Sequence, residues 1–236
     1  NLNFINNYNL VINTDSSNNI AKKYFSKKII KKYNCVAYTT IINHKKIVND
    51  IATQIFTKRG PLAFLPVSKN ETSIVYSVFN SEDKSKENVK HLIEKYNFKY
   101  KFEKIGEIQS MKLQSLSLRS YYHKNILAFG DLLHRIHPLA GQGFNMTIRD
   151  IKTLLRIIKN KHDLGLPIDS SVNYEFENNS KYKNYIFSNG VDLINEFFNL
   201  ERKTKTKFLS KTVQTIAKNS FVNKTLINFA DKGIFV

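Results

Sequence analysis

The sequence has no tryptophan, one cysteine, four prolines and eight glycines among its 236 residues. The single cysteine, Cys35, excludes an internal disulfide and favours a reducing compartment in which this side chain is a small buried apolar group. The scarcity of proline and glycine excludes a collagen-like or linker-dominated chain. No apolar run reaches the roughly 18 residues of a transmembrane helix, and the polar start, Asn1–Asn9, does not resemble a signal peptide. These absences, with 42% hydrophobic and 12% aromatic residues, predict a folded cytoplasmic protein.

Acidic residues are scarce as well, with 19 Asp and Glu against 37 Lys and Arg and a formal net charge of +18. Eight lysines and no acid lie between Ser16 and Lys46, and residues 201–236 carry eight basic residues and two acids. Such patches can meet nucleic acid or an anionic membrane face. No nucleic-acid recognition motif accompanies the charge, so we expect no nucleic-acid partner. Lysines on a solvated surface are the alternative to a membrane contact.

Residue patterns predict a β-rich first half and a helical second half. β-Branched and aromatic residues predict strands, several of them in an antiparallel meander, at 8–13, 35–42, 52–57, 62–66, 73–79, 102–118 and 125–129. Apolar residues at helical spacing predict helices over 21–32, 81–96, 145–161, 171–187, 191–200 and 203–230. The predicted fold class is α/β (α+β). The patterns divide the chain into a short first segment (1–30), a β-rich domain (31–118), a strand–loop–helix segment (119–161) and a helical C-terminal region (162–236).

One strand–loop–helix stretch carries the strongest chemical signal. A buried strand ends next to Asp131, which places a carboxylate at the carboxyl end of a strand, where α/β proteins bind ligands. Pro138, Gly141 and Gly143 follow, and glycine lets the backbone come close to a flat ligand. The helix predicted from Asn145 directs free N–H groups and a positive dipole end at the same loop. A ligand with hydroxyl groups and an electron-rich oxygen would suit this arrangement; a glycine-rich turn with an Asp cap is the structural alternative.

The same stretch resembles a known motif. Its pattern, Gly-Asp-x-x-His-x-x-x-Pro-x-x-Gly-Gln-Gly-x-Asn-x-x-x-x-Asp from Gly130 to Asp150, is similar to the second flavin-contact motif of aromatic-hydroxylase flavoprotein monooxygenases. The form Pro-Leu-Ala-Gly-Gln-Gly-Phe-Asn looks most like the UbiH/UbiF/VisC group, which hydroxylates ubiquinone precursors. Residues 56–66 resemble that group's substrate-domain strand pair, and residues 230–233 resemble the end of such proteins. The likeness runs from about Leu10 to the C-terminus. It implies an incomplete FAD/NAD(P)-binding aromatic-hydroxylase-like fold, with an antiparallel substrate-domain sheet and a helical C-terminal tail.

The resemblance also implies a function and a cofactor site. The activity would be FAD-dependent hydroxylation of the aromatic ring of a polyprenylated phenol in ubiquinone biosynthesis, with NAD(P)H as co-substrate. Asp131 would hydrogen-bond the ribityl or pyrophosphate part of FAD, and Pro138 would sit beside the isoalloxazine. A run of five residues would line that ring: Gly141, Gln142, Gly143, Phe144 and Asn145. No side chain of this motif acts as a nucleophile, so no catalytic residue is implied.

Two departures from the family pattern bear on this prediction. The Gly-x-Gly-x-x-Gly loop that cradles the FAD pyrophosphate is absent from these 236 residues, so the chain alone should bind FAD poorly. The family's Ala-Asp-Gly motif, which takes part in NAD(P)H handling, corresponds to Thr14-Asp15-Ser16, where serine replaces the glycine. Serine would be strained at a position that needs a positive φ, so this departure puts NAD(P)H handling by the chain in question. A truncated sequence, a gene split into two chains and a degenerate non-catalytic subunit all fit. Asn1 in place of Met favours truncation.

Two features remain. His134 and His137 lie three residues apart but have no third ligand at metal-site spacing, so no metal is expected. Residues 202–218 place lysines beside an apolar stripe, which suits either peripheral contact with the inner membrane face or packing on the protein itself. The alternative to an enzyme is a non-catalytic subunit that binds the lipid substrate or assembles a ubiquinone-biosynthesis complex.

Overall fold

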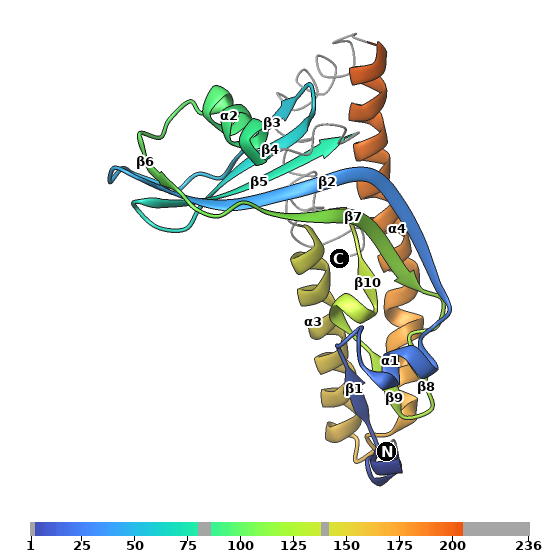
Figure 1. Cartoon of the computed structure of the whole chain (residues 1–236). Coiled ribbons are helices and arrows are strands. Elements are labelled where there is room, and N and C mark those ends of the chain that lie inside the picture. The colour runs from blue at the N-terminus through green and yellow to red at the C-terminus, as the bar shows by residue number, and fades with distance from the viewer. Residues whose placement is uncertain (1–2, 80–85, 138–141, 205–236) are drawn as a thin grey trace, which may run out of the picture. The chain divides into compact units, whose positions relative to one another are not determined.

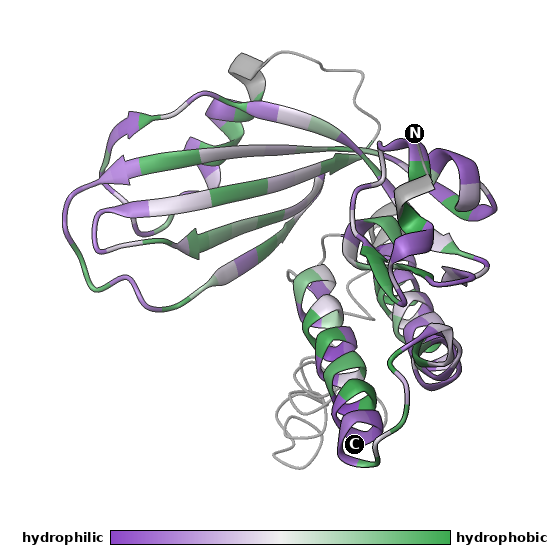
Figure 2. Cartoon of the chain, turned by 90° about the horizontal axis from the view of Figure 1, so that it is seen from below, coloured by the Kyte–Doolittle hydropathy of each residue, from purple (hydrophilic) through white to green (hydrophobic). Residues whose placement is uncertain are grey.

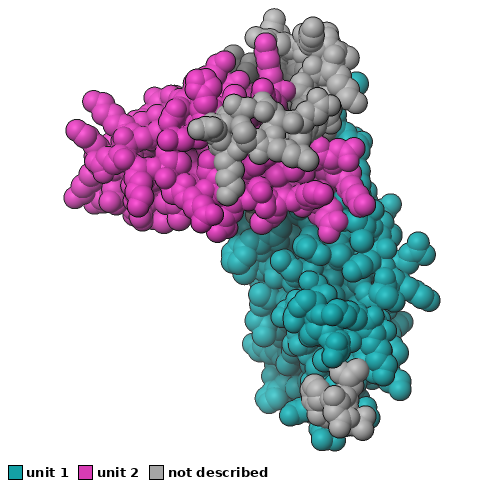
Figure 3. All heavy atoms as spheres, in the orientation of Figure 1, with its two compact units in different colours: residues 1–31, 115–236 teal, residues 32–114 magenta. Residues whose placement is uncertain are grey.

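The computed structural model describes residues 3–79, 86–137 and 142–204 (Figure 1). The chain divides into two compact units (Figure 3). Unit 1 combines residues 1–31 with 115–236, and unit 2 consists of residues 32–114. Strand β2 (Lys28–His44) leads from unit 1 into unit 2, and strand β7 (Gln109–Leu118) leads back. Unit 1 therefore joins the start of the chain to the flavin-contact motif and to the helices that follow it.

Unit 2 is built on an antiparallel sheet. Strands β3 (Thr53–Thr57), β4 (Gly60–Pro66) and β5 (Glu71–Phe79) form the predicted meander, and the order continues through β2 to β7. Strand β6 (Phe102–Ile105) pairs with the far end of β2. Hydrophobic and hydrophilic residues follow one another along these strands (Figure 2). Helix α2 (Lys86–Tyr96) adds Val89 and Ile93 to a core that contains the fully buried Phe64 and Tyr76.

The turn between β3 and β4 requires glycine. Gly60 has a φ of +140°, a conformation that residues with a Cβ rarely adopt. A Cβ at this position would lie 2.0 Å from the backbone oxygen of Ser77 on β5. The close approach of β4 and β5 therefore depends on the missing side chain of Gly60.

Unit 1 contains a small sheet in the order β1-β9-β8, formed by β1 (Val11–Asn13), β9 (Ile126–Ala128) and β8 (Tyr122–His123). The 3-10 helix η1 (Asn3–Asn7) precedes β1, and helix α1 (Asn19–Tyr24) follows it. The side chain of Asn18 caps α1 by accepting a hydrogen bond from the N–H of Ala21 at 2.8 Å. After β9 come the 3-10 helix η2 (Gly130–Leu132) and strand β10 (His134–Arg135), which pairs with the end of β7.

Two long helices complete unit 1. Helix α3 (Gln142–Asp163) buries residues at helical spacing, Met146, Asp150, Leu154 and Ile157. Helix α4 (Ser170–Thr204) packs against α3 and contributes Val172 and Phe176 to the main core. No helix among the described residues is long and apolar enough to cross a membrane.

The structure corrects two secondary-structure predictions. The helix predicted over 21–32 ends at Tyr24, and residues from Lys28 onward belong to the 17-residue strand β2. Pairing in the sheet outweighs the local helical pattern there. The helices predicted at 171–187 and 191–200 are one continuous helix, α4, with Gly190 in its interior. The helix predicted over 203–230 lies almost wholly outside the described residues.

Candidate functional site

The predicted carboxylate stands at the end of a parallel strand pair. Strand β1 pairs with β9 in parallel register, so the carboxyl ends of both strands lie at one edge (Figure 1). The N–H of Phe129 extends the pairing by donating to the oxygen of Asn13 at 2.9 Å. The chain then turns at Gly130, which has a φ of +59°. Asp131 follows with an exposed side chain, so its carboxylate is accessible to a ligand.

The turn after β1 reaches the same edge of the sheet. Asp15 accepts hydrogen bonds at Oδ1 from the N–H and the hydroxyl of Ser17, at 2.7 and 2.6 Å, and these bonds lower its pKa. The side chains of Asn13 and Asn18 exchange two hydrogen bonds across the turn. The strain expected at Ser16 is absent, because Ser16 is not among the described residues with positive φ. An Asx turn centred on Asp15 shapes this loop without a glycine.

The predicted ring-lining residues lie at the start of α3. Gln142, Gly143 and Asn145 are half-buried, whereas Phe144 is 73% exposed. The first turn of α3 has no acidic residue, so nothing there offsets the positive end of the helix dipole. The Oε1 atom of Gln142 is buried and has no hydrogen-bond partner among the described residues. The two other predicted residues, Pro138 and Gly141, lie outside the described residues.

A buried hydrogen-bond network joins β10, before this loop, to α3, after it. Nε2 of His134, on β10, lies 2.5 Å from Oδ2 of Asp150 on α3, and both side chains are 3% exposed. Nδ2 of Asn184, on α4, donates to Oδ1 and Oδ2 of Asp150 at 3.0 and 3.3 Å. Asn184 also hydrogen-bonds the hydroxyl of Tyr121, whose pKa is raised, chiefly by burial.

The motif identifies His134 from the sequence, but Asn184 and Tyr121 were not predicted. A signal for Asn184 was present. Buried residues on α4 recur every three or four positions, and Asn184 interrupts an otherwise mainly apolar series: Val172, Phe176, Ser180, Asn184, Phe187, Val191 and Asn195. A polar residue inside such a stripe indicates a buried hydrogen-bond partner.

The second histidine of this stretch, His137, is buried as His134 is, and its environment lowers its pKa. His137 is fully buried, and burial lowers its pKa to about 4, against an opposing effect of Asp192. The ring is therefore neutral near pH 7. Within residues 3–79, 86–137 and 142–204, no three His, Cys, Asp or Glu side chains are grouped so as to hold a metal ion.

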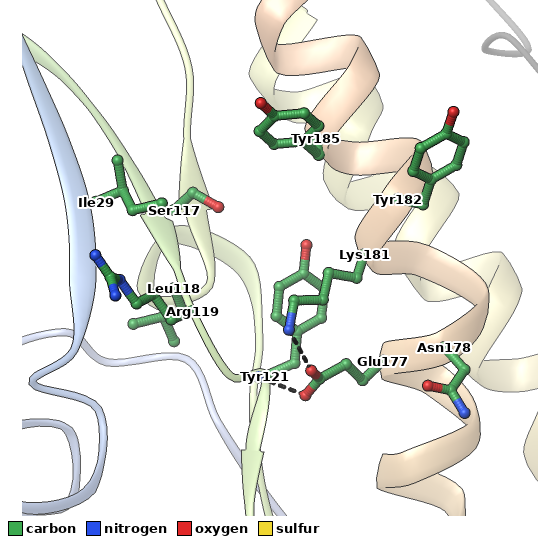
Figure 4. A pocket seen from close by; sticks show the side chains of 10 residues that line it. All are labelled: Ile29, Ser117, Leu118, Arg119, Tyr121, Glu177, Asn178, Lys181, Tyr182 and Tyr185. Carbon is green, nitrogen blue, oxygen red and sulfur yellow. Dashed lines mark hydrogen bonds and ion pairs between the residues drawn. The ribbon is translucent and has the colours of Figure 1, made fainter.

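A cavity of about 550 Å³ lies beside the network in unit 1 (Figure 4). Both carboxylate oxygens of Glu177, on α4, have partners there: Oε1 lies 2.5 Å from Nζ of Lys181, and Oε2 accepts from the N–H of Tyr121 at 2.9 Å. Tyr121 is thus shared by the cavity and the network. The ten lining residues come from β2, from the end of β7 and the turn after it, and from α4: Ile29, Ser117, Leu118, Arg119, Tyr121, Glu177, Asn178, Lys181, Tyr182 and Tyr185.

Residues 15–161, more than half of the chain, match the FAD binding domain family. The chain belongs to this family. That match covers Asp131 and all but the last two residues of α3, and it ends before α4.

Several relatives are named as enzymes that act in ubiquinone biosynthesis. The chain is 28% identical to 3-demethoxyubiquinol 3-hydroxylase of Escherichia coli over 61% of this chain and 39% of that protein. It is 23% identical to the mitochondrial ubiquinone biosynthesis monooxygenase COQ6 of Danio rerio over 94% of this chain and 55% of that protein. The chain therefore spans about half the length of the curated relatives it matches.

The solved structures agree on the fold. p-Nitrophenol 4-monooxygenase PnpA from Pseudomonas putida matches 96% of this chain and 60% of its own chain, with a TM-score of 0.74 and 12% sequence identity. At this identity the likeness concerns the fold alone. It confirms the predicted aromatic-hydroxylase-like fold of class α/β (α+β).

The described residues of the motif fit a flavin. Asp131 offers an accessible acceptor for hydroxyl groups, and α3 offers an uncompensated helix start. The orphaned Oε1 of Gln142 can accept a hydrogen bond from a ligand N–H or O–H group. Of the described residues, a Cβ on Gly143 would meet only Ile136, at 3.8 Å, which leaves the backbone there open to close approach from these residues' side.

Proposed function

We propose that this chain is the substrate-domain and flavin-contact part of an FAD-dependent hydroxylase that acts on the aromatic ring of a polyprenylated phenol in ubiquinone biosynthesis. One observation carries the proposal. The parallel β1–β9 pair delivers Asp131 to the sheet edge, in a chain whose family is the FAD binding domain and whose relatives are named as ubiquinone hydroxylases.

The cofactor would be held by the motif residues. Asp131 would accept hydrogen bonds from the hydroxyl groups or phosphate side of FAD, and Gln142, Gly143, Phe144 and Asn145 would line its ring system. The predicted residues Pro138 and Gly141 belong to the same proposal. Bound FAD, reduced by NAD(P)H, supplies the chemistry that activates oxygen and transfers one of its atoms to the substrate ring.

The protein's own part is to bind, orient and exclude water. N–H groups at the start of α3 would stabilise negative charge that develops on the ligand near them, because they are fixed and partly shielded from solvent. The neutral ring of His137 adds no charge to this loop near pH 7. The antiparallel sheet of unit 2 would supply the surface for the prenylated phenol, and the basic residues of the tail favour peripheral contact with an anionic membrane face.

The proposal is tested by titrating the chain with FAD and following flavin absorbance and fluorescence. The chain should be measured alone and preceded by any reading frame encoded upstream. We expect Asp131→Ala to raise the dissociation constant about tenfold, because a hydrogen bond to a charged group is lost. Asp163→Ala, at the other end of α3, is the matched control and should leave it unchanged. Failure of both forms to bind FAD would favour a non-catalytic subunit that binds the lipid or assembles a biosynthetic complex.

A further inference from the structure

The flavin-contact loop lies between two residues of the sequence motif that hydrogen-bond each other. The hydrogen bond between His134 and Asp150 joins β10, before the loop, to α3, after it. Its two partners are 16 residues apart in the sequence, and every predicted cofactor contact after Asp131 lies between them. The geometry of this one bond therefore limits how the start of α3 lies relative to the end of β10.

Asp150 needs more than His134 to hold its position. A buried carboxylate is stable only when its acceptor sites are filled by donors. Nδ2 of Asn184 donates two further hydrogen bonds to Asp150, at 3.0 Å to Oδ1 and 3.3 Å to Oδ2. Asn184 is itself 7% exposed and comes from α4, beyond residues 15–161 that match the family.

The orientation of Asn184 is fixed in turn by Tyr121. Burial raises the pKa of the Tyr121 hydroxyl and the hydrogen bond with Asn184 lowers it, so the Asn184 amide is the donor and the Tyr121 oxygen the acceptor in this contact. Tyr121 is 1% exposed, and its own N–H is bound by Glu177 of α4. These contacts leave Asn184 a single amide orientation, and they direct donors at both oxygens of Asp150.

A fixed Asp150 also fixes the tautomer of His134. A carboxylate accepts hydrogen bonds and donates none, so Nε2 of His134 carries the hydrogen of their 2.5 Å contact, and the bonds from Nδ2 of Asn184 keep Oδ2 of Asp150 directed at that nitrogen. The imidazole is thereby oriented through a residue 50 positions away in the sequence.

We propose that Asn184 is a positioning residue for the flavin-contact segment, acting through Asp150 and His134. The inference rests on the proposed flavin-binding function. It predicts that removing the Asn184 amide disturbs the His134 ring and weakens flavin binding, although Asn184 is not one of the predicted cofactor contacts.

Asn184→Leu tests this, because leucine has a similar volume and no polar group. Asn173→Leu is the matched control: Asn173 is a fully buried asparagine on the same helix that donates to the oxygen of Lys124 at 3.1 Å. Both variants bury leucine in place of an amide. A common loss of stability, measured by urea unfolding, would therefore not account for a difference between them.

The first readout uses the chain without FAD. Long-range proton–nitrogen NMR of the His134 ring should show the Nε2–H tautomer in the wild type and in Asn173→Leu, and a mixture of tautomers in Asn184→Leu. An unchanged His134 spectrum in Asn184→Leu would overturn the proposal, whether or not the chain binds flavin.

The second readout is FAD titration on the form that binds FAD. We expect the dissociation constant to rise about tenfold for Asn184→Leu and less than about twofold for Asn173→Leu. In the Asp150→Asn background, Asn184→Leu should add little, because the two residues act through one contact. Equal losses for both leucine variants would show a purely structural role and overturn the proposal. If no form binds FAD, the proposed function fails while the NMR result still decides the role of Asn184.

Discussion

The two units differ in what they bury. Unit 2 is one continuous segment with an aliphatic and aromatic core, and its buried polar residues among those described are Thr40, His44, Thr72 and Ser77. Unit 1 is assembled from two distant segments and buries a longer polar series: Asn13, His134, His137, Asp150, Asn173, Ser180, Asn184 and Asn195. Buried polar groups destabilise a fold unless they are paired. The units differ in how these groups are paired: His134, Asp150 and Asn184 of unit 1 form one network beside the flavin-contact motif. His44 and Thr72 of unit 2 instead pair between neighbouring strands of its sheet.

The largest effect is expected at the tightest point of unit 2. Gly60→Ala should destabilise that unit by about 5 kcal/mol, because the new Cβ collides with the Ser77 oxygen and the φ of +140° is unfavourable for alanine. Hydrogen exchange followed by mass spectrometry should show lost protection in β4 and β5. Gly190→Ala is the control: its Cβ meets no atom of the described residues within 4 Å, and alanine inside α4 should add up to about 1 kcal/mol of stability. Normal exchange in Gly60→Ala would show that the strands can separate without cost.

The separateness of the two cores can be tested by deleting one aromatic ring from each. Phe64 of unit 2 and Phe176 of unit 1 are both fully buried, and alanine at either position should cost about 4 kcal/mol. Phe64→Ala should raise hydrogen exchange in β3–β5, and Phe176→Ala should raise it in α3 and α4. Equal loss of protection throughout the chain in both variants would mean that the units unfold as a single block.

The buried polar series of unit 1 should give it a pH dependence through His137. Burial lowers the folded-state pKa of His137 to about 4 from 6.5, so the unfolded chain binds a proton at pH values where the folded chain does not. The free energy of unfolding should therefore fall as the pH drops from about 6.5 to about 4, by roughly 2 kcal/mol between pH 7 and pH 5. Urea unfolding at the two pH values measures this.

His137→Phe should reduce this pH difference, whereas His162→Gln, at an exposed histidine, should keep it. An unaltered pH dependence in His137→Phe would assign the effect to other groups.

Features encoded within a few residues were predictable from the sequence, and features that depend on distant partners were not. The meander over β3–β5 and the strand–loop–helix around Asp131 were predicted because alternation, turn residues and apolar periodicity are local signals. The strand at Lys28–Lys32 was missed because sheet pairing overrides a short helical pattern. The break expected near Gly190 was wrong because the buried stripe of α4 continues on both sides of it. The stripe of α4 marks Asn184 as a buried polar position, but no local pattern pairs it with Asp150, which lies 34 positions earlier.

Helix α4 has a practical consequence for dissecting the protein into pieces. A fragment cut to residues 15–161 would keep every described motif position from Asp131 to Asp150 and would look complete on a sequence alignment. It would nevertheless lose Val172 and Phe176 from the main core, and Asn184 from Asp150. Lys31 would also lose its ion pairs with Asp192 and Glu196, at 3.2 and 2.5 Å. The smallest piece worth expressing is therefore set by the far end of a 35-residue helix and not by the limits of the recognisable motif.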